Sequence, residues 1–122
     1  MARGDIVIGY RKINDQTAAI DIRGELTSFA ESDLLGALTG VSHADLRYII
    51  LNFTDMSYMN SSGIGLLVML LVRANRLGYQ LMAVGLKDHF RNVFELTRLN
   101  QALPIYADES EALNTISSGI SI

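Results

Sequence analysis

Hydrophobic and polar residues alternate in two segments near the start of the chain, residues 5–11 and residues 17–23. Alternation with a period of two is typical of a half-buried β-strand. Asn14-Asp15-Gln16 separates the two segments with turn-forming residues, so the pattern predicts an antiparallel strand pair. Short runs of apolar and β-forming residues predict three further strands, at 47–53, 80–84 and 104–106.

Helical spacing of apolar residues predicts four helices, at 28–38, 63–77, 87–99 and 108–116. Ser28 is the expected N-cap of the first helix, with Glu31 completing a capping box, and Gly40 is expected to stop it. Asp108 is the expected cap of the last helix. The second helix is apolar nearly all round until Arg73, so we expect it to be mostly buried.

The predicted order is two strands followed by alternating helices and strands. This order favours an α/β fold, in which a mixed, mostly parallel sheet of about five strands is packed with about four helices. No linker, repeat or low-complexity tract interrupts residues 1–122, so we expect a single domain. Residues 117–122 are expected to form a frayed tail.

The composition supports a folded domain and argues against several classes of ligand and partner. The 122 residues are 49% hydrophobic, and the net charge is -3 with Lys and Arg scattered, which argues against nucleic-acid binding. There is no Cys, and neither His43 nor His89 has metal-ligand spacing, so no metal site is expected. No signal peptide is visible, and the apolar run Ile64–Val72 is too short for membrane insertion. We expect a cytoplasmic protein.

The most informative segment is Asp55–Gly65, which lies between a predicted buried strand and a predicted helix. Ser61 and Ser62 lie between the predicted strand and the predicted helix, where the N-terminus of the helix can bind a phosphate. From the residues alone, either serine can be a simple helix cap or a modified residue. Gly63 and Gly65 lack a full nucleotide-binding fingerprint and are expected to let the helix approach the sheet closely.

Residues 51–66 resemble the signature of the STAS domain, a family found in bacterial anti-sigma factor antagonists. In that family a strand precedes Ser, an aromatic residue, an apolar residue and then Asp-Ser-(Ser or Thr)-Gly-(Leu or Ile)-Gly. This chain has Ser-Tyr-Met-Asn-Ser-Ser-Gly-Ile-Gly at residues 57–65. Further segments agree with the family in the same order, at 23–26 (Arg-Gly-Glu-Leu), 85–86, 93–99 and 103–106.

The resemblance implies a partner switch. Ser61 is then the phosphorylated residue, with Ser62 as the fallback, and the partner is an anti-sigma factor that is itself a serine kinase. The unphosphorylated antagonist binds that kinase and frees a sigma factor, and a phosphatase resets the phosphorylated form. ATP and Mg²⁺ belong to the kinase, so no cofactor is expected in this chain. The expected partner-binding residues are Glu25, Thr27, Tyr58, Asn60, Ser61, Ser62, Gly63 and Ile64.

Two positions depart from the family pattern. The Asp that precedes the phospho-acceptor is Asn60 here, and the acidic residue that often follows Gly-Glu-Leu is Thr27 here. Asn caps a helix as well as Asp does, so the fold is not affected. Ser62 is expected to act as a cap whose hydroxyl closes the turn. The electrostatics around Ser61 do change, so either phosphorylation is slower or the kinase supplies the charge that the reaction needs.

Two other functions stay open at this stage. One is a STAS scaffold or adaptor subunit, in a signalling assembly or an ABC lipid transporter, that phosphorylation does not regulate. The other is a hydrolase with a Ser61–His89–Asp55 triad, which the missing Gly-x-Ser-x-Gly pattern disfavours. We therefore expect no catalytic residues and no enzyme activity. Apolar helix faces leave a homodimer open.

Overall fold

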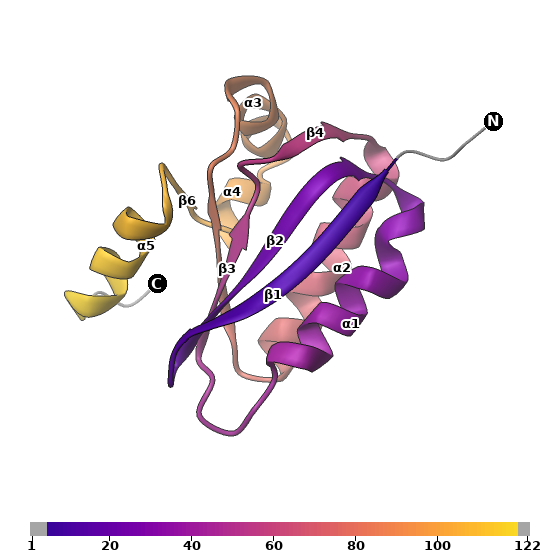
Figure 1. The fold of residues 1–122 in the computed structure, drawn as a ribbon. Helices are drawn as coiled ribbons and strands as arrows, with labels where there is room; N and C mark the ends of the chain where they lie inside the picture. Colours follow the sequence, from indigo (N-terminus) through magenta and orange to yellow (C-terminus); the bar gives the residue numbers. More distant parts are fainter. Residues whose placement is uncertain (1–4, 120–122) are drawn as a thin grey trace.

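The computed structural model describes residues 5–119 (Figure 1). Six strands are described there: β1 (Ile6–Asn14), β2 (Thr17–Leu26), β3 (Tyr48–Asn52), β4 (Met56–Met59), β5 (Gln80–Val84) and β6 (Ile105–Tyr106). The helices are the 3₁₀ turn η1 (Ser28–Ala30), α1 (Glu31–Val41), α2 (Ser61–Arg76), α3 (Asp88–Leu96), α4 (Leu99–Ala102) and α5 (Glu109–Ser117). Of the predicted tail 117–122, Ser117 ends α5, and residues 120–122 lie outside the described residues.

The strands form one sheet in the order β1-β2-β3-β5-β6, with β4 attached to the end of β2. β1 and β2 are antiparallel, and every other pair is parallel. The predicted α/β class and the mixed, mostly parallel sheet are therefore confirmed.

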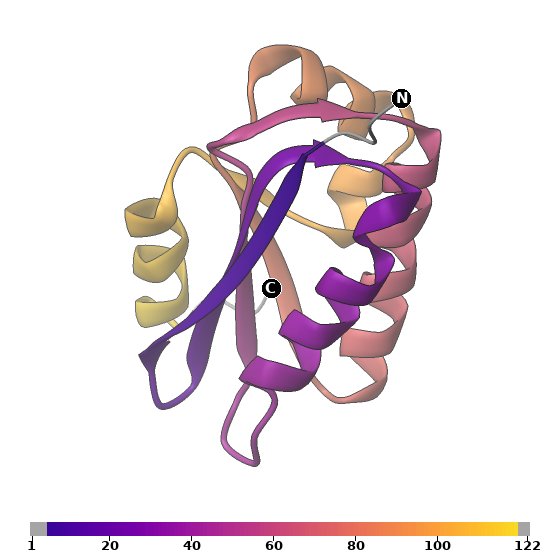
Figure 2. The ribbon, with the colours of Figure 1, turned by 45° about the vertical axis from the view of Figure 1, so that its right-hand side comes forward.

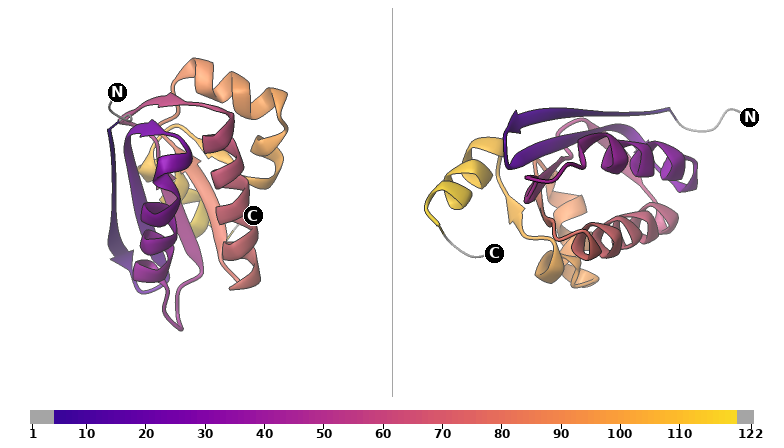
Figure 3. Two further views of the ribbon diagram at one scale, coloured as in Figure 1. Left: turned by 90° about the vertical axis from the view of Figure 1, so that its right-hand side faces the viewer. Right: turned by 90° about the horizontal axis from the view of Figure 1, so that it is seen from below.

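Alternating side chains of the sheet reach two different cores. Ile20, Ile22 and Leu51 are fully buried on the face that α1 and α2 cover. Ala19 and Ile50 belong to a second cluster together with Ala112 of the C-terminal helix α5. Figures 2 and 3 show α5 on the side of the sheet opposite α1 and α2. The sheet is thus a middle layer between the α1–α2 pair and α5, and the N-terminus of α2 stands at one end of this arrangement.

The strand β4 was not predicted. It pairs in parallel with the end of β2, where Gly24 lies opposite Met56, Glu25 opposite Tyr58 and Leu26 opposite Met59. Only Met56 among its residues is fully buried, so its sequence shows no clear alternation. Because β4 leads directly into α2, this pairing holds the start of α2 beside the end of β2.

Several predicted helix ends are wrong by a few residues. Ser28 is not a cap, because Thr27 Oγ1 instead accepts a hydrogen bond from the backbone N–H of Phe29 at 3.4 Å. Gly40 does not stop α1, which continues to Val41. The cap predicted at Asp108 is confirmed, since its Oδ1 accepts from the backbone N–H of Glu111 at 2.9 Å.

The third predicted helix is two helices. Residues 87–99 were expected to be continuous, but α3 ends at Leu96 and α4 begins at Leu99. Arg98 between them has φ of 61°, a left-handed conformation that a continuous helix does not contain. The sequence has no Gly or Pro at this break, so it carries no obvious signal.

A polar cluster joins β1, β2, β3 and α5 on the side of the sheet away from α1 and α2. Asp21 is 8% exposed and accepts two hydrogen bonds from Arg11, both of 2.9 Å, and one from Asn52, also of 2.9 Å. Arg11 also pairs with Glu109 of α5 at 2.6 Å. The hydrogen bonds from Arg11 lower the pKa of the Asp21 carboxyl, so this buried charge is compensated.

Candidate functional site: the N-terminus of helix α2

Asn60 is the N-cap of α2. Its backbone is extended, with φ of -109°, and its Oδ1 accepts a hydrogen bond from the backbone N–H of Gly63 at 3.0 Å. Its own carbonyl accepts the first helical bond, from Ile64 at 3.1 Å. The expectation that Ser62 closes the turn with its hydroxyl is therefore wrong, because the Asn side chain already does so.

Ser61 and Ser62 are the first two residues of α2, and both are exposed. Within residues 5–119, no hydrogen bond reaches the hydroxyl or the backbone N–H of either serine. Free N–H groups at a helix N-terminus carry partial positive charge and donate hydrogen bonds readily to anionic partners. The Ser61 hydroxyl is thus accessible and lies beside backbone N–H donors that no group of residues 5–119 occupies.

Gly63 lets α2 approach the sheet. It is buried, and a side-chain carbon at this position would collide with the backbone carbonyl of Leu26. Gly65 is exposed, and a carbon there would meet nothing within 4 Å. The predicted close approach is therefore confirmed at Gly63 and wrong at Gly65.

The residues predicted to bind a partner lie together, although the structure holds no partner that tests them. Glu25 and Tyr58 are register neighbours in β2 and β4, and the backbone N–H of Asn60 donates to the Leu26 carbonyl at 3.4 Å. Three are exposed (Tyr58, Ser61 and Ser62), four are half-buried (Glu25, Thr27, Asn60 and Ile64) and Gly63 is buried. Partner contact by these residues stays a prediction.

One face of α2 carries an apolar stripe that was not predicted from the sequence. Gly65, Val68 and Val72 follow Ser61 at i+4, i+7 and i+11, which places all four on one helix face. Val68 and Val72 are each 45% exposed, so the expectation that this helix is mostly buried is wrong for its outer face. Phe29 of η1 adds a ring that is 55% exposed. The i, i+4, i+7 spacing from Ser61 was the available signal.

The charged groups of this region are few. The first turn of α2 contains no acidic residue. Lys87, which precedes α3, donates from Nζ to the Met56 carbonyl at 3.0 Å and so ties α3 to the start of β4. Asp55 lies 3.8 Å from Arg23 across their side chains. No carboxylate of the first turn therefore opposes an anion at Ser61.

The geometry does not assemble the hydrolase triad. The His89 ring packs against the ring of Phe90 with centroids 3.9 Å apart, and Asp55 pairs with Arg23. Among the residues that the structure describes, no hydrogen bond joins Ser61 to His89 or Asp55.

The described residues also show no metal site and no membrane span. No group of three or more His, Cys, Asp or Glu among them is placed to hold a metal ion. None of the described helices is both long and apolar enough to cross a membrane.

Comparison with known proteins identifies the class to which this fold and site belong. Residues 11–112 match the model of the STAS domain, and the chain belongs to that family. Among its relatives, the anti-sigma-B factor antagonist of Staphylococcus aureus strain NCTC 8325 is 30% identical over 91 residues, which cover 75% of this chain and 84% of the relative.

Two solved structures of one protein share the fold. The anti-sigma factor antagonist SpoIIAA in its unphosphorylated form superposes with a TM-score of 0.73 at 25% identity, covering 95% of this chain and all 100% of that one. The phosphorylated form of SpoIIAA from Bacillus gives a TM-score of 0.64 at 22% identity, covering 90% and 99%. The chain is therefore similar to anti-sigma factor antagonists in both sequence and fold.

Proposed function

We propose that this protein is an anti-sigma factor antagonist whose binding to an anti-sigma serine kinase is switched off by phosphorylation of Ser61. The unphosphorylated form binds the kinase and thereby releases a sigma factor. The observation that carries the proposal is the accessible Ser61 hydroxyl at the first position of α2, beside two unoccupied backbone N–H groups. The relatives named above support it, because SpoIIAA exists in both an unphosphorylated and a phosphorylated form.

The fold can accept a phosphate at Ser61 without rearranging. A phosphoryl group adds a charge of about -1.5 to -2 and three acceptor oxygens. The free N–H groups of Ser61 and Ser62 and the positive end of the α2 dipole face these oxygens favourably. Asn60 replaces the family's Asp, so the first turn adds no like-charge repulsion.

The same phosphate opposes binding to a partner that covers Ser61. Such an interface would take the phosphate out of water, and burying a charge without pairing it costs roughly several kcal/mol. Val68, Val72 and Tyr58 on this surface are all about half exposed, and none of these side chains can pair with the added charge. One modification can therefore preserve the fold and abolish the complex.

A phosphorylation assay tests the assignment of Ser61. The protein is incubated with an anti-sigma kinase, ATP and Mg²⁺, and the intact mass and the modified residue are measured. We expect one phosphoryl group on the wild type and on Ser62→Ala, and none on Ser61→Ala. Ser62→Ala is the matched control because Ser62 is the exposed neighbour in the same helical turn. Unmodified protein that still forms a stable complex would overturn the switch and support an unregulated scaffold subunit.

A further inference from the structure

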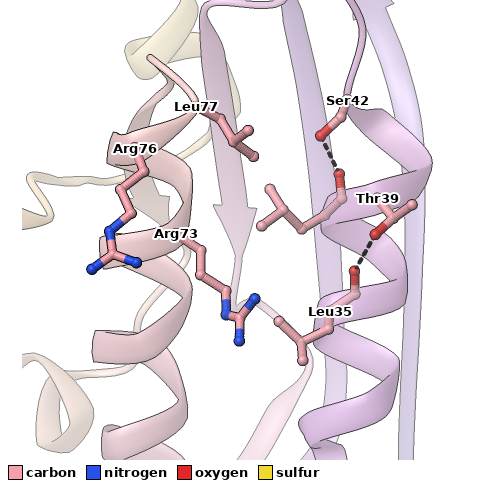
Figure 4. A pocket seen from close by; sticks show the side chains of 7 residues that line it. Leu35, Thr39, Ser42, Arg73, Arg76 and Leu77 are labelled. Carbon is pink, nitrogen blue, oxygen red and sulfur yellow. Dashed lines mark hydrogen bonds between the residues drawn. The ribbon is translucent and has the colours of Figure 1, made fainter.

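A groove of about 330 Å³ separates the C-terminal parts of α1 and α2, at the opposite end of α2 from Ser61 (Figure 4). Its apolar lining comes from Leu35 and Leu38 of α1 and from Leu77, which follows α2 and is 56% exposed. In Figure 4 the side chains of Leu35 and Leu77 point into the space between the helices. Leu77 is exposed, Leu35 is half-buried and Leu38 is buried, so this apolar lining lies mostly inside a concavity, which fits a convex surface of a partner molecule.

The wall that α1 contributes has little polar capacity to spare. Thr39 Oγ1 donates to the Leu35 carbonyl at 3.0 Å, and Ser42 Oγ donates to the Leu38 carbonyl at 2.6 Å. Both hydroxyl hydrogens are therefore already donated to backbone carbonyls of α1. Hydrogen bonds or ion pairs to a molecule bound in the groove would therefore come mainly from the wall that α2 forms.

That opposite wall carries two cations without a partner. Arg73 and Arg76 lie in the last turn of α2, and within residues 5–119 neither forms an ion pair. None of the described residues that line the groove carries a carboxylate, although the whole chain has a net charge of -3. Figure 4 shows the Arg73 side chain extending from α2 toward α1. The helix dipole favours arginines at this end of α2, but it does not account for the exposed side chain of Leu77 beside them.

We infer that this groove docks an acidic amphipathic α-helix of a partner protein. The apolar face of such a helix would pack on Leu35, Leu38 and Leu77, and carboxylates along its edge would pair with Arg73 and Arg76. Two cations are too few for a nucleic-acid surface or for adsorption to anionic lipid, which take clusters of basic residues. A single protein helix satisfies the shape and the charge together.

Docking in this groove does not depend on the phosphorylation state of Ser61. Arg73 follows Ser61 by 12 residues of continuous helix, a distance of about 18 Å at 1.5 Å per residue. Charges separated by that distance across a surface are largely screened at physiological ionic strength, where the Debye length is about 8 Å. The groove therefore goes beyond the proposed switch, because it offers a binding site to partners that recognise both forms of the protein.

The test is a titration of the ¹⁵N-labelled full chain followed by NMR. The probe is a synthetic helical peptide of about four turns, with Leu at i, i+3, i+4 and i+7 and Glu along the flanking positions. Two control peptides carry Lys in place of Glu, or the same residues in scrambled order. We expect the acidic peptide to shift groove amides such as those of Leu35, Thr39 and Leu77, with a Kd on the order of 100 µM or tighter.

Variants and a lipid arm complete the experiment. The Arg73→Gln, Arg76→Gln double variant is expected to weaken peptide binding at least about tenfold. Arg23→Gln, at an exposed arginine on the opposite side of the sheet, should leave it unchanged, and Ser61→Asp should alter it less than about twofold. No binding, equal binding of the scrambled or Lys peptide, shifts outside the groove, or binding to phosphatidylglycerol vesicles in place of the peptide would each overturn the inference.

Discussion

Asn60 Oδ1 accepts the hydrogen bond from the Gly63 backbone N–H, at 3.0 Å, that begins helix α2. Because the amide side chain of Asn60 performs the capping, neither serine hydroxyl is needed to hold the helix start. Capping therefore belongs to Asn60, whereas the phosphate acceptance that we propose belongs to Ser61. This separation means that the two roles can be tested independently.

Replacing Asn60 measures the capping role. Asn60→Ala removes the acceptor for the Gly63 N–H and should lower the free energy of unfolding by about 1 kcal/mol. Asn60→Asp restores the residue that the family has here and should retain the stability of the wild type, since Asp caps equally well. Chemical denaturation of the three proteins provides the measurement. Equal stability of Asn60→Ala and wild type would show that the bond does not stabilise α2.

The two glycines of the first turns give opposite predictions. Gly63→Ala places a methyl group against the Leu26 carbonyl and should destabilise the protein by about 1–3 kcal/mol, because backbone atoms must shift. Gly65→Ala is the matched control: its site is open, and the better helix propensity of Ala should stabilise by up to about 1 kcal/mol. Thermal unfolding distinguishes the two, and similar effects of both substitutions would contradict the close approach at Gly63.

Hydrophobic periodicity predicts most of the sheet correctly, since β1, β2, β3, β5 and β6 all show alternation or a short apolar run. It fails at β4, where the pairing with β2 is long-range and the strand has just four residues. It also fails at the α3–α4 break, where Arg98 adopts a left-handed conformation that a residue of this type seldom takes. The pairing of β4 with β2 is a tertiary contact, which local pattern does not report.

Some features of the candidate site could likewise be predicted from the sequence, and others could not. The strand-to-helix position of Ser61 follows from the sequence, and so does the capping ability of Asn60. The sequence does not reveal which of three neighbouring polar residues caps α2, because Asn and Ser are nearly equivalent N-caps. Nor does it show that the apolar face of α2 at Val68 and Val72 is left partly exposed by the other described helices and strands. That fact depends on where the other helices pack.

The exposed stripe of α2 is expected to belong to the kinase-binding surface. Val68→Asp introduces a charge on this stripe and should weaken kinase binding at least about tenfold. Stability should change little, since the side chain is already 45% exposed. Val7→Asp is the control, because Val7 is 61% exposed on the opposite side of the sheet. Isothermal titration with the kinase measures both, and unchanged affinity for Val68→Asp would place the interface elsewhere.

Asp21 makes stability depend on pH in the acid range. The hydrogen bonds from Arg11 hold the pKa of the Asp21 carboxyl below its unfolded value of about 3.9. Its stabilising contribution is therefore complete above that unfolded pKa and is lost as the pH falls through it toward the folded pKa. Asp21→Asn should be less stable at neutral pH, by about 1–2 kcal/mol, and should lose less stability on acidification from about pH 5 to about pH 2.

Asp15→Asn serves as the control for this acid dependence. Asp15 is 88% exposed, and within residues 5–119 its one ion pair is with exposed Lys12. Its removal should therefore leave both the neutral stability and the acid slope close to those of wild type. Urea denaturation across the pH range provides the data. An acid slope for Asp21→Asn that matches wild type would show that the cluster around Asp21 does not control this dependence.

The decisive measurement of the proposed switch is the affinity of the anti-sigma kinase for the purified unphosphorylated and Ser61-phosphorylated forms. We expect the phosphorylated form to bind with a Kd at least about 100-fold higher, a loss of about 2.7 kcal/mol in binding free energy. We also expect its melting temperature to stay within about 5 °C of that of the unphosphorylated form, because the N-terminus of α2 can hold the phosphate. Equal affinities of the two forms, or loss of binding through unfolding of the phosphorylated protein, would contradict the switch.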